Sequence, residues 1–339
     1  MSETLLEVKD LKKHFVPHLT LAQSLSGGKK RVIKAVDGVS FAIQKGEIFG
    51  LIGESGSGKT TTGKLIMKLI DPTSGSIHFD GEDVTFTNKA KTQEYRRKVQ
   101  MIFQDPYASM NPRFKIRDVL MEPLIIHRMH GKREEQIQRV IQALNEVKLT
   151  PPEEFLVRYP HMLSGGQRQR TATARTLILN PKMLVADEPV SMIDLSTRAE
   201  ILHMMKEVQR DMGLTYLYIT HDLSTARYFT DRIAVMYLGR IVEMGPADEI
   251  IDNPVHPYTQ ALIAAVPEPQ SGKVDIIKQL PISGEIPSPA NIPPGCRFHT
   301  RCPYATEACS TNAEPELMDI GNGHFHACAR WKEIPKMKH

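Results

Sequence analysis

The order of apolar and polar residues along this chain changes repeatedly between the period of a strand and the period of a helix. Short apolar runs predict buried strands at 48–52, 99–103, 183–187 and 216–220. Segments with helical spacing lie between them, most clearly at 114–148 and 198–212. Strands that alternate with helices favour a mostly parallel sheet with flanking helices, so we expect an α/β fold.

A glycine-rich stretch, Gly53-Glu54-Ser55-Gly56-Ser57-Gly58-Lys59-Thr60, separates the first of these strands from a helical segment. Its glycines let backbone N–H groups surround an anion, and the following helix adds the positive end of its dipole. Lys59 then reaches the outer phosphates, and the Thr60 hydroxyl holds Mg²⁺. The order strand, loop, helix predicts a phosphate loop; a chance glycine-rich turn is the alternative.

The N-terminal region alternates with the period of a strand. Leu5 and Val8 lie in one predicted strand, and residues 32–41 alternate again after a polar insertion that ends near 26–29. Phe15, at the end of the first strand, is the aromatic residue best placed to stack on a nucleotide base. An edge-strand core position is the alternative interpretation of this phenylalanine.

Polar residues stand directly after the later apolar strands. Gln104 follows one strand, Asp187 and Glu188 end the next, and His221 follows the last. Because parallel strands deliver their carboxyl ends to one edge of a sheet, these side chains are expected to meet a ligand there. Asp187 is expected to serve the metal of the nucleotide, Glu188 to take a proton from an attacking water, and His221 to contact a γ-phosphate. For each of them, a structural or solvated residue is the alternative.

A second helix start follows the sequence Leu163-Ser164-Gly165-Gly166-Gln167. A serine and two glycines before a helix offer an anion the same backbone and dipole as the first loop. An ordinary N-cap is the alternative.

The composition of the chain indicates how many domains and which kinds of partner to expect. With 339 residues, 41% of them hydrophobic and 24% charged, the chain is long enough for about two domains and is not disordered. The net charge of +4 is mild and the basic residues occur in short groups, so no nucleic-acid partner is expected. No apolar run approaches the roughly 18 to 20 residues that span a bilayer, and the N-terminus lacks signal-peptide order. We expect a cytoplasmic chain whose membrane role comes through partners.

The tail beyond Gly245-Pro246 is rich in proline and holds all four cysteines, Cys296, Cys302, Cys309 and Cys328. Clustered cysteines in a cytoplasmic chain favour a metal over disulfides. Thiolates suit both Zn²⁺ and an iron-sulfur cluster, and the lack of short C-x2-C pairs tilts the interpretation slightly away from zinc. We expect changes to these cysteines to loosen the tail from about Pro281 and to leave ATP binding at the distant phosphate loop nearly intact.

Together these motifs occur in the order and spacing of the ATP-binding subunits of ABC transporters, which this chain resembles. The shared elements are Gly53 to Thr60, Gln104, Leu163 to Gln167, Met183 to Glu188, Ser191 to Asp194, and His221. Leu-Ser-Gly-Gly-Gln is the signature of that family. The usual Ser-Ala-Leu-Asp is Ser-Met-Ile-Asp here, which keeps the polar ends, so we expect no loss of activity.

The resemblance implies a P-loop ABC ATPase core at 1–245, with an antiparallel β subdomain and a helical subdomain at about 106–178. It implies that ATP is held by Gly53, Ser55, Gly56, Ser57, Gly58, Lys59, Thr60 and Thr61, with Asp194 nearby. It assigns Mg²⁺ to Thr60, Gln104 and Asp187, and general-base catalysis to Glu188 assisted by His221 and Gln104. Ser164, Gly165, Gly166 and Gln167 would close on the ATP of a second subunit, so two chains would clamp two nucleotides.

The tail, 246–339, resembles the C-terminal domain of one branch, the oligopeptide/dipeptide importer ATPases. The matching segments are Asn253 to Thr259, Pro293 to Phe298 and Arg301 to Pro303. The resemblance implies a [4Fe-4S] cluster on the four cysteines, with Zn²⁺ as the alternative. It also implies two transmembrane permease subunits, a second homologous ATPase in a heterodimer or homodimer, and, indirectly, an external solute-binding protein. The chain would then power peptide import from the cytoplasmic face of the membrane.

Other functions share most of these motifs. Related importers carry oligosaccharides or nickel. A soluble ABC ATPase acting on ribosomes or DNA would have the same nucleotide motifs, although the ribosomal kind normally carries two ATPase units and this chain has one P-loop. A regulatory module in which the four cysteines sense iron or oxygen is a third possibility.

Overall fold

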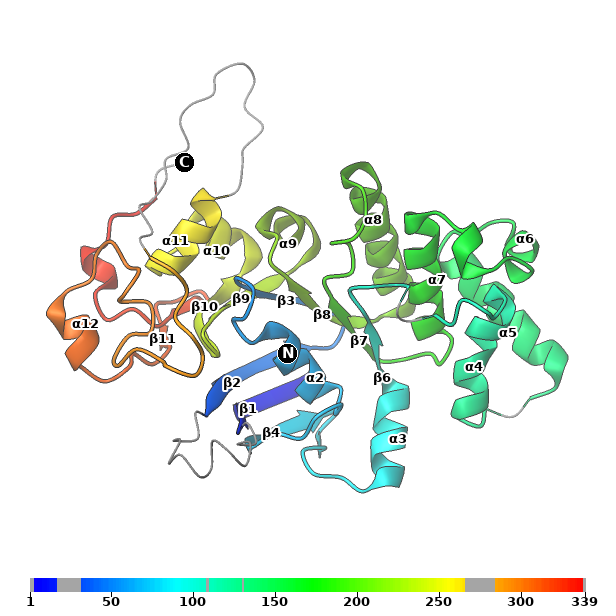
Figure 1. Ribbon diagram of the computed structural model, residues 1–339, viewed down its shortest axis with the longest axis horizontal. Helices are drawn as coiled ribbons and strands as arrows, with labels where there is room; N and C mark the ends of the chain where they lie inside the picture. The colour runs from blue at the N-terminus through cyan, green and yellow to red at the C-terminus, as the bar shows by residue number, and fades with distance from the viewer. Residues whose placement is uncertain (1–2, 17–31, 108–109, 130, 266–283, 338–339) are drawn as a thin grey trace, which may run out of the picture.

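The computed structural model describes residues 3–16, 32–107, 110–129, 131–265 and 284–337 (Figure 1). Within these ranges the central sheet has eight strands in the order β11-β12-β10-β9-β3-β8-β7-β6. Their bounds are β3 Ile48–Ile52, β6 Val99–Ile102, β7 Met183–Asp187, β8 Thr215–Thr220, β9 Arg232–Tyr237, β10 Arg240–Pro246, β11 Met318–Asp319 and β12 Phe325–His326. The predicted insertion near 26–29 lies outside the described residues.

The middle of this sheet is parallel, which confirms the α/β fold expected from the apolar runs. β3 pairs in parallel with β8 and β9, and β7 pairs in parallel with β8 and β6. Every residue of β3, β7 and β8 is buried, as expected for strands covered on both faces. Their carboxyl ends therefore meet at one edge, where the predicted polar residues emerge.

A smaller antiparallel sheet packs against the first. Its strands, in the order β2-β1-β4-β5, are β1 Thr4–Phe15, β2 Ile33–Gln44, β4 Ser74–Phe79 and β5 Glu82–Asp83. Phe41 of β2 stacks on Phe49 of β3 with ring centroids 5.1 Å apart, which joins the two sheets. The predicted strands near residues 5–8 and 32–41 are present in this sheet.

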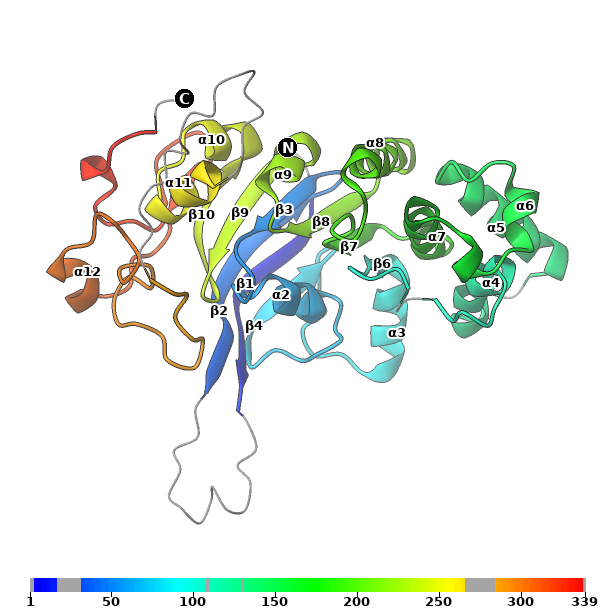
Figure 2. The ribbon, with the colours of Figure 1, turned by 45° about the horizontal axis from the view of Figure 1, so that its top comes forward.

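Helices cover the central sheet and extend from one end of it (Figures 1 and 2). Those near the sheet are α2 Lys59–Ile66, α3 Lys89–Lys98, α8 Leu195–Met212, α9 Leu223–Phe229, α10 Ala247–Asp252 and α11 Pro257–Ala264. Those gathered beyond β6 are α4 Ile116–Ile126, α5 Arg133–Glu146, α6 Pro152–Leu156, η1 Pro160–Met162 and α7 Gly165–Leu177. The helical segment expected at 114–148 is thus two helices, α4 and α5.

The C-terminal residues extend the central sheet. β12 pairs antiparallel with β10, so that Glu243 faces His326, and the short β11 pairs with β12. The remaining C-terminal helices are α12 Glu307–Thr311 and η2 Trp331–Glu333. In the described parts of the chain, no helix combines the length and the hydropathy needed to span a bilayer.

Candidate nucleotide site

The glycine-rich loop joins β3 to α2 and fits closely against the rest of the core. A Cβ atom at Gly53 would lie 2.2 Å from the carbonyl oxygen of Met236, and one at Gly58 would lie 2.3 Å from that of Ala35. Gly58 also has a φ of 108°, in the region that favours glycine. The loop therefore needs glycine at both positions. The start of α2 adds the positive end of its dipole to a phosphate held there.

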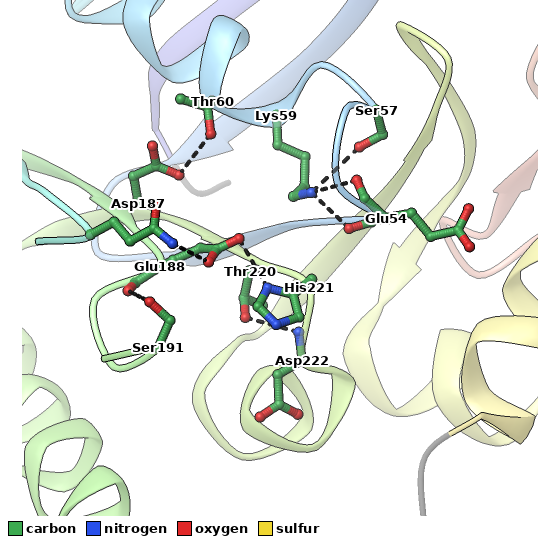
Figure 3. A network of polar contacts seen from close by, with 12 residues as sticks. Glu54, Ser57, Lys59, Thr60, Asp187, Glu188, Ser191, Thr220, His221 and Asp222 are labelled. Atoms are coloured by element: carbon green, nitrogen blue, oxygen red, sulfur yellow. Dashed lines mark hydrogen bonds and ion pairs between the residues drawn. The ribbon is translucent and has the colours of Figure 1, made fainter. Parts of the chain in front are cut away.

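Lys59 lies across this loop and is 5% exposed. Its Nζ donates to the carbonyl oxygens of Gly53 and Glu54 at 2.7 and 2.9 Å (Figure 3). Burial lowers the pKa of Lys59, opposed by the carboxylates of Glu188 and Asp187. A buried ammonium held by two carbonyls gains a stronger partner when a phosphate enters the loop.

Thr60 and Asp187 lie together although they come from different elements. The Thr60 hydroxyl, at the start of α2, donates to Oδ1 of Asp187, at the end of β7, at 3.2 Å. Burial raises the pKa of Asp187, and the Thr60 hydrogen bond and nearby Lys59 oppose that rise. A hydroxyl and a carboxylate at the mouth of a phosphate loop fit Mg²⁺, which takes oxygen ligands from protein and phosphate. When bound, Mg²⁺ would neutralise charge on the phosphates.

Three strand-end residues converge beside this pair, and Figure 3 labels two of them, Glu188 and His221. The Gln104 amide donates to Oε2 of Glu188 at 3.0 Å, and Nδ1 of His221 lies 2.9 Å from Oε1. Each oxygen of the Glu188 carboxylate thus has its own partner, which fixes the orientation of the group. The backbone of Glu188 has a φ of 48° and donates its N–H to Ile219 of β8 at 2.8 Å. A carboxylate held in this way next to the phosphate loop can accept a proton from water.

The predicted signature segment lies away from the phosphate loop within this chain, with Ser164 and Gly165 exposed and Leu163 and Gly166 buried. Ser164 caps α7, its Oγ accepting from the Gln167 N–H at 3.3 Å while the Gln167 side chain accepts from the Ser164 N–H at 3.1 Å. Figures 1 and 2 place α7 beyond β6 and β7, on the far side from α2. Gly165 has open space around it, whereas a Cβ at Gly166 would lie 2.7 Å from Thr197.

Two further predicted residues stand apart from this cluster. Asp194 is exposed and precedes α8 as its N-cap, without a side-chain hydrogen bond to the helix. Phe15, at the end of β1, is 40% exposed, and Lys13 Nζ lies 5.3 Å from its ring centroid. Stacking of Phe15 on a nucleotide base stays a prediction.

Sequence reasoning missed the contacts that the tail makes with the phosphate loop. Arg301, next to Cys302, holds the Glu54 carboxylate with two hydrogen bonds of 2.7 and 3.1 Å. Tyr258 Oη accepts from the Glu54 N–H at 2.9 Å. The expectation of a phosphate loop distant from the cysteine region is therefore wrong. The Arg-Cys-Pro and His-Pro-Tyr-Thr segments stood out in the sequence as shared with the importer branch. The sequence does not indicate that they contact Glu54.

All four cysteines line one cavity of about 260 Å³, with Phe298, Tyr304 and Ile334 among its other lining residues. Each is a free thiol, and burial raises the pKa of Cys296 to about 11 and that of Cys328 to about 12. The four cysteines are partly buried, and neutral thiols are poor nucleophiles, which favours a structural or ligating role. In the described ranges, no three His, Cys, Asp or Glu side chains converge closely enough to hold one metal ion. The four cysteines therefore share a cavity without forming a preassembled ligand set for either alternative, zinc or an iron-sulfur cluster.

Comparisons with known proteins agree with this geometry. The model of the ABC transporter family matches residues 36–191, and that of the oligopeptide/dipeptide transporter C-terminal region matches 242–309. The oligopeptide transport ATP-binding protein AppF of Bacillus subtilis is 46% identical over 327 residues, 96% of this chain and 97% of that protein. The di/tripeptide transport ATP-binding protein DppF of Pseudomonas aeruginosa is 45% identical over 319 residues, 93% and 94% of the two chains.

A solved structure extends the comparison to the fold. The ATP-binding cassette MJ0796, in a dimeric post-hydrolysis state bound to ADP and Pi, matches 72% of this chain and 99% of its own, with a TM-score of 0.62 and 28% identity. A phosphate loop on a parallel sheet, with strand-end carboxylates beside it, defines the class of P-loop ATPases. The chain belongs to the ABC transporter ATP-binding proteins, in the oligopeptide/dipeptide branch. It is therefore a membrane-associated, ATP-hydrolysing subunit that works with permease subunits and a second ATPase.

Proposed function

We propose that this chain powers the import of peptides by binding and hydrolysing ATP at the cytoplasmic face of the membrane. The observation that carries the proposal is the similarity over nearly the whole chain, including the tail, to proteins named for oligopeptide and di/tripeptide transport. An external solute-binding protein would deliver the peptide to the permeases. The ATPase itself never meets the solute, so its residues do not distinguish one peptide from another.

In the proposed cycle the phosphate loop and Lys59 bind the ATP phosphates, and Thr60, Asp187 and Gln104 hold Mg²⁺. Glu188 accepts a proton from the attacking water, and His221 contacts the γ-phosphate. The segment 164–167 contacts the ATP bound by the second subunit, with Asp194 beside the nucleotide. The exposure of Ser164 and Gly165 at the start of α7 supports this role, because a helix N-terminus favours an anion presented from outside the chain.

A groove between α2, β6 and α4 suits a permease segment. It has a volume of about 160 Å³, and its lining includes the apolar side chains of Leu69, Phe103 and Ile126, which are 43%, 43% and 56% exposed. Phe103 precedes Gln104, which contacts Glu188 at 3.0 Å. Phe103 and Gln104 thus connect the groove to the proposed base, Glu188. Movement of a permease segment in the groove would shift Gln104 and, with it, the Glu188 carboxylate.

The substrate class is tested with the complete transporter in proteoliposomes supplied with ATP inside and binding protein outside. We expect uptake of a labelled di- or oligopeptide that stops when ATP is left out. A labelled oligosaccharide and Ni²⁺ serve as alternative solutes under the same conditions. Uptake of either one, without peptide uptake, would replace the peptide proposal and leave the ATP-driven machine in place.

The cavity lined by the four cysteines supports the proposal of an iron-sulfur cluster. The cavity has a volume of about 260 Å³, which leaves room for a group larger than a single ion. Four thiols around one cavity fit the Cys₄ ligand set of a [4Fe-4S] cluster. The cluster would supply ligand bonds that hold the tail together, because the segment has little secondary structure of its own.

Protein purified without oxygen is expected to be brown and to contain iron and acid-labile sulfide in equal amounts, with loss of colour on oxidation. A Cys302→Ser protein should lose the colour and most of the iron, whereas Ser310→Ala, on α12 beside the cavity, should keep both. Colourless wild-type protein with one zinc would replace the cluster by a zinc site. Metal-free wild-type protein with disulfides would contradict both.

A further inference from the structure

The two ends of the phosphate loop are held by residues of the C-terminal tail. At the first end, Glu54 has both carboxylate oxygens on the Arg301 guanidinium and its N–H on Tyr258 Oη. In Figure 3 the Glu54 carboxylate points away from Lys59, out of the nucleotide site. Glu54 therefore does not occupy the place of a phosphate; it attaches the loop to the tail.

The Arg301 side chain is buried and packed against its neighbours. It is 7% exposed and lies over the rings of Tyr237 and Phe298, 5.8 and 5.9 Å from their centroids. Tyr258 is fully buried and packs on the same two rings at 4.6 and 5.4 Å. Hydrogen bonding to Glu54 is the main cause that raises the pKa of Arg301, so the guanidinium stays charged. Two hydrogen bonds between a guanidinium and a carboxylate fix the relative orientation of the two groups as well as the distance between them.

A second arginine of the tail holds the other end of the loop indirectly. Arg297 donates to the carbonyl oxygen of Leu238 and pairs with Asp37. Gly239, the residue after Leu238, donates its N–H to the Ser57 carbonyl oxygen at 2.8 Å. Burial would raise the pKa of Asp37, but hydrogen bonds from Arg297 and His14 outweigh it and bring the pKa to about 2.

The contacts from the tail fix the part of the phosphate loop that positions Lys59. The carbonyl oxygens of Gly53 and Glu54 accept from Lys59, so a rotation of this backbone would redirect the ammonium. A loop that is already ordered does not lose conformational freedom when nucleotide binds. We propose that Arg301 is a positioning residue that holds the phosphate loop through Glu54, so that nucleotide affinity depends on the cysteine-bearing tail.

This inference rests on the proposed ATPase function and adds that nucleotide binding depends on the order of the tail. Arg301 and Cys302 are consecutive, and Phe298 lies two residues after Cys296. Arg301, which holds the Glu54 carboxylate, is thus in the same turn as two of the cysteines that line the cavity. Any change that disorders this turn moves Arg301, which gives the tail a direct route to the phosphate loop.

The test is a double-mutant cycle on the full-length protein, with Mg·ADP affinity measured by titration calorimetry. Arg301→Ala and Glu54→Ala should each weaken ADP binding by about tenfold, the equivalent of reordering about one loop residue on binding. The double variant should bind no worse than the weaker single variant, because both changes break one contact. Glu333→Ala is the control, since it truncates an exposed glutamate of the tail that pairs with Arg330 and not with Arg301 or Glu54.

A kinetic readout separates positioning from a general loss of structure. In the assembled transporter, Arg301→Ala should raise the KM for ATP while kcat stays within about twofold, because Glu188, Gln104 and His221 are untouched. Partial unfolding would instead lower the maximal rate at unchanged KM. Arg301→Lys, which keeps the charge without the paired contact, takes the place of Arg301→Ala in the cycle if that protein aggregates.

Two results would overturn the inference. One is ADP binding by the Arg301 variant as tight as in Glu333→Ala; the other is effects of Arg301 and Glu54 that multiply in the double variant. Failure of the proposed function has a different signature, because wild-type protein would then neither bind nor hydrolyse ATP.

Discussion

Replacing Glu188 by glutamine is expected to slow ATP hydrolysis by about 10²-fold or more while ATP binding is retained, since this is the usual scale of base catalysis. The change keeps the shape of the side chain and removes its ability to accept a proton. Contacts with Gln104 and His221, now 3.0 and 2.9 Å, are retained in part because the imidazole can exchange donor and acceptor roles. ATP should therefore accumulate unhydrolysed and hold two subunits together.

Phosphate release and nucleotide affinity, measured on one preparation, check this expectation. Glu200→Gln is the matched control, because it makes the same chemical change at an exposed glutamate of α8. Hydrolysis at the wild-type rate in the Glu188 variant, free of contaminating ATPase, would mean that another group activates the water.

The Ser164→Arg protein is expected to bind ATP nearly normally and to fail to form the closed pair of subunits. Ser164 is exposed at the start of α7, away from the phosphate loop of its own chain. A long charged side chain there would obstruct a nucleotide presented by the partner and would remove the helix cap, which costs about 1 kcal/mol. Mixed with an intact partner subunit, the variant should disable the composite site that needs Ser164.

Asn88→Arg provides the control for Ser164→Arg. Asn88 is likewise an exposed helix N-cap, accepting from the Lys91 N–H at 2.9 Å, but it begins α3 instead of α7. Both changes remove a cap and add an arginine, so only the expected subunit contact differs. An unchanged hydrolysis rate in the mixed complex of the Ser164 variant would contradict a shared site.

The nucleotide site was largely predictable because its parts are local in sequence. The phosphate loop lies within eight consecutive residues, 53–60, and each strand-end residue is marked by the apolar run before it. Parallel strands then bring Gln104, Glu188 and His221 together at one edge without further information. This is why residues 84 and 33 positions apart in the chain were expected to meet, and their side chains do so.

Features that depend on packing were less predictable. The helical segment predicted after the glycine-rich stretch is short, because α2 ends at Ile66. Lys68 has a φ of 54°, and its Nζ donates to the carbonyl oxygen of Thr85 at 3.0 Å, so the chain turns and Leu69 faces the groove. The contact between Arg301 and Glu54 joins residues 247 positions apart. No period or motif specifies which acid a distant arginine meets.

The central claim, that ATP hydrolysis by this chain drives peptide import, is tested most directly by measuring peptide uptake and phosphate release together in proteoliposomes. The transporter is assembled once with wild-type chain and once with the Glu188→Gln chain. The account predicts that peptide accumulates inside only with the wild-type chain, in proportion to the ATP hydrolysed. Peptide accumulation at the wild-type rate with the Glu188 variant would contradict it, as would hydrolysis that continues without any uptake of peptide by the wild-type complex.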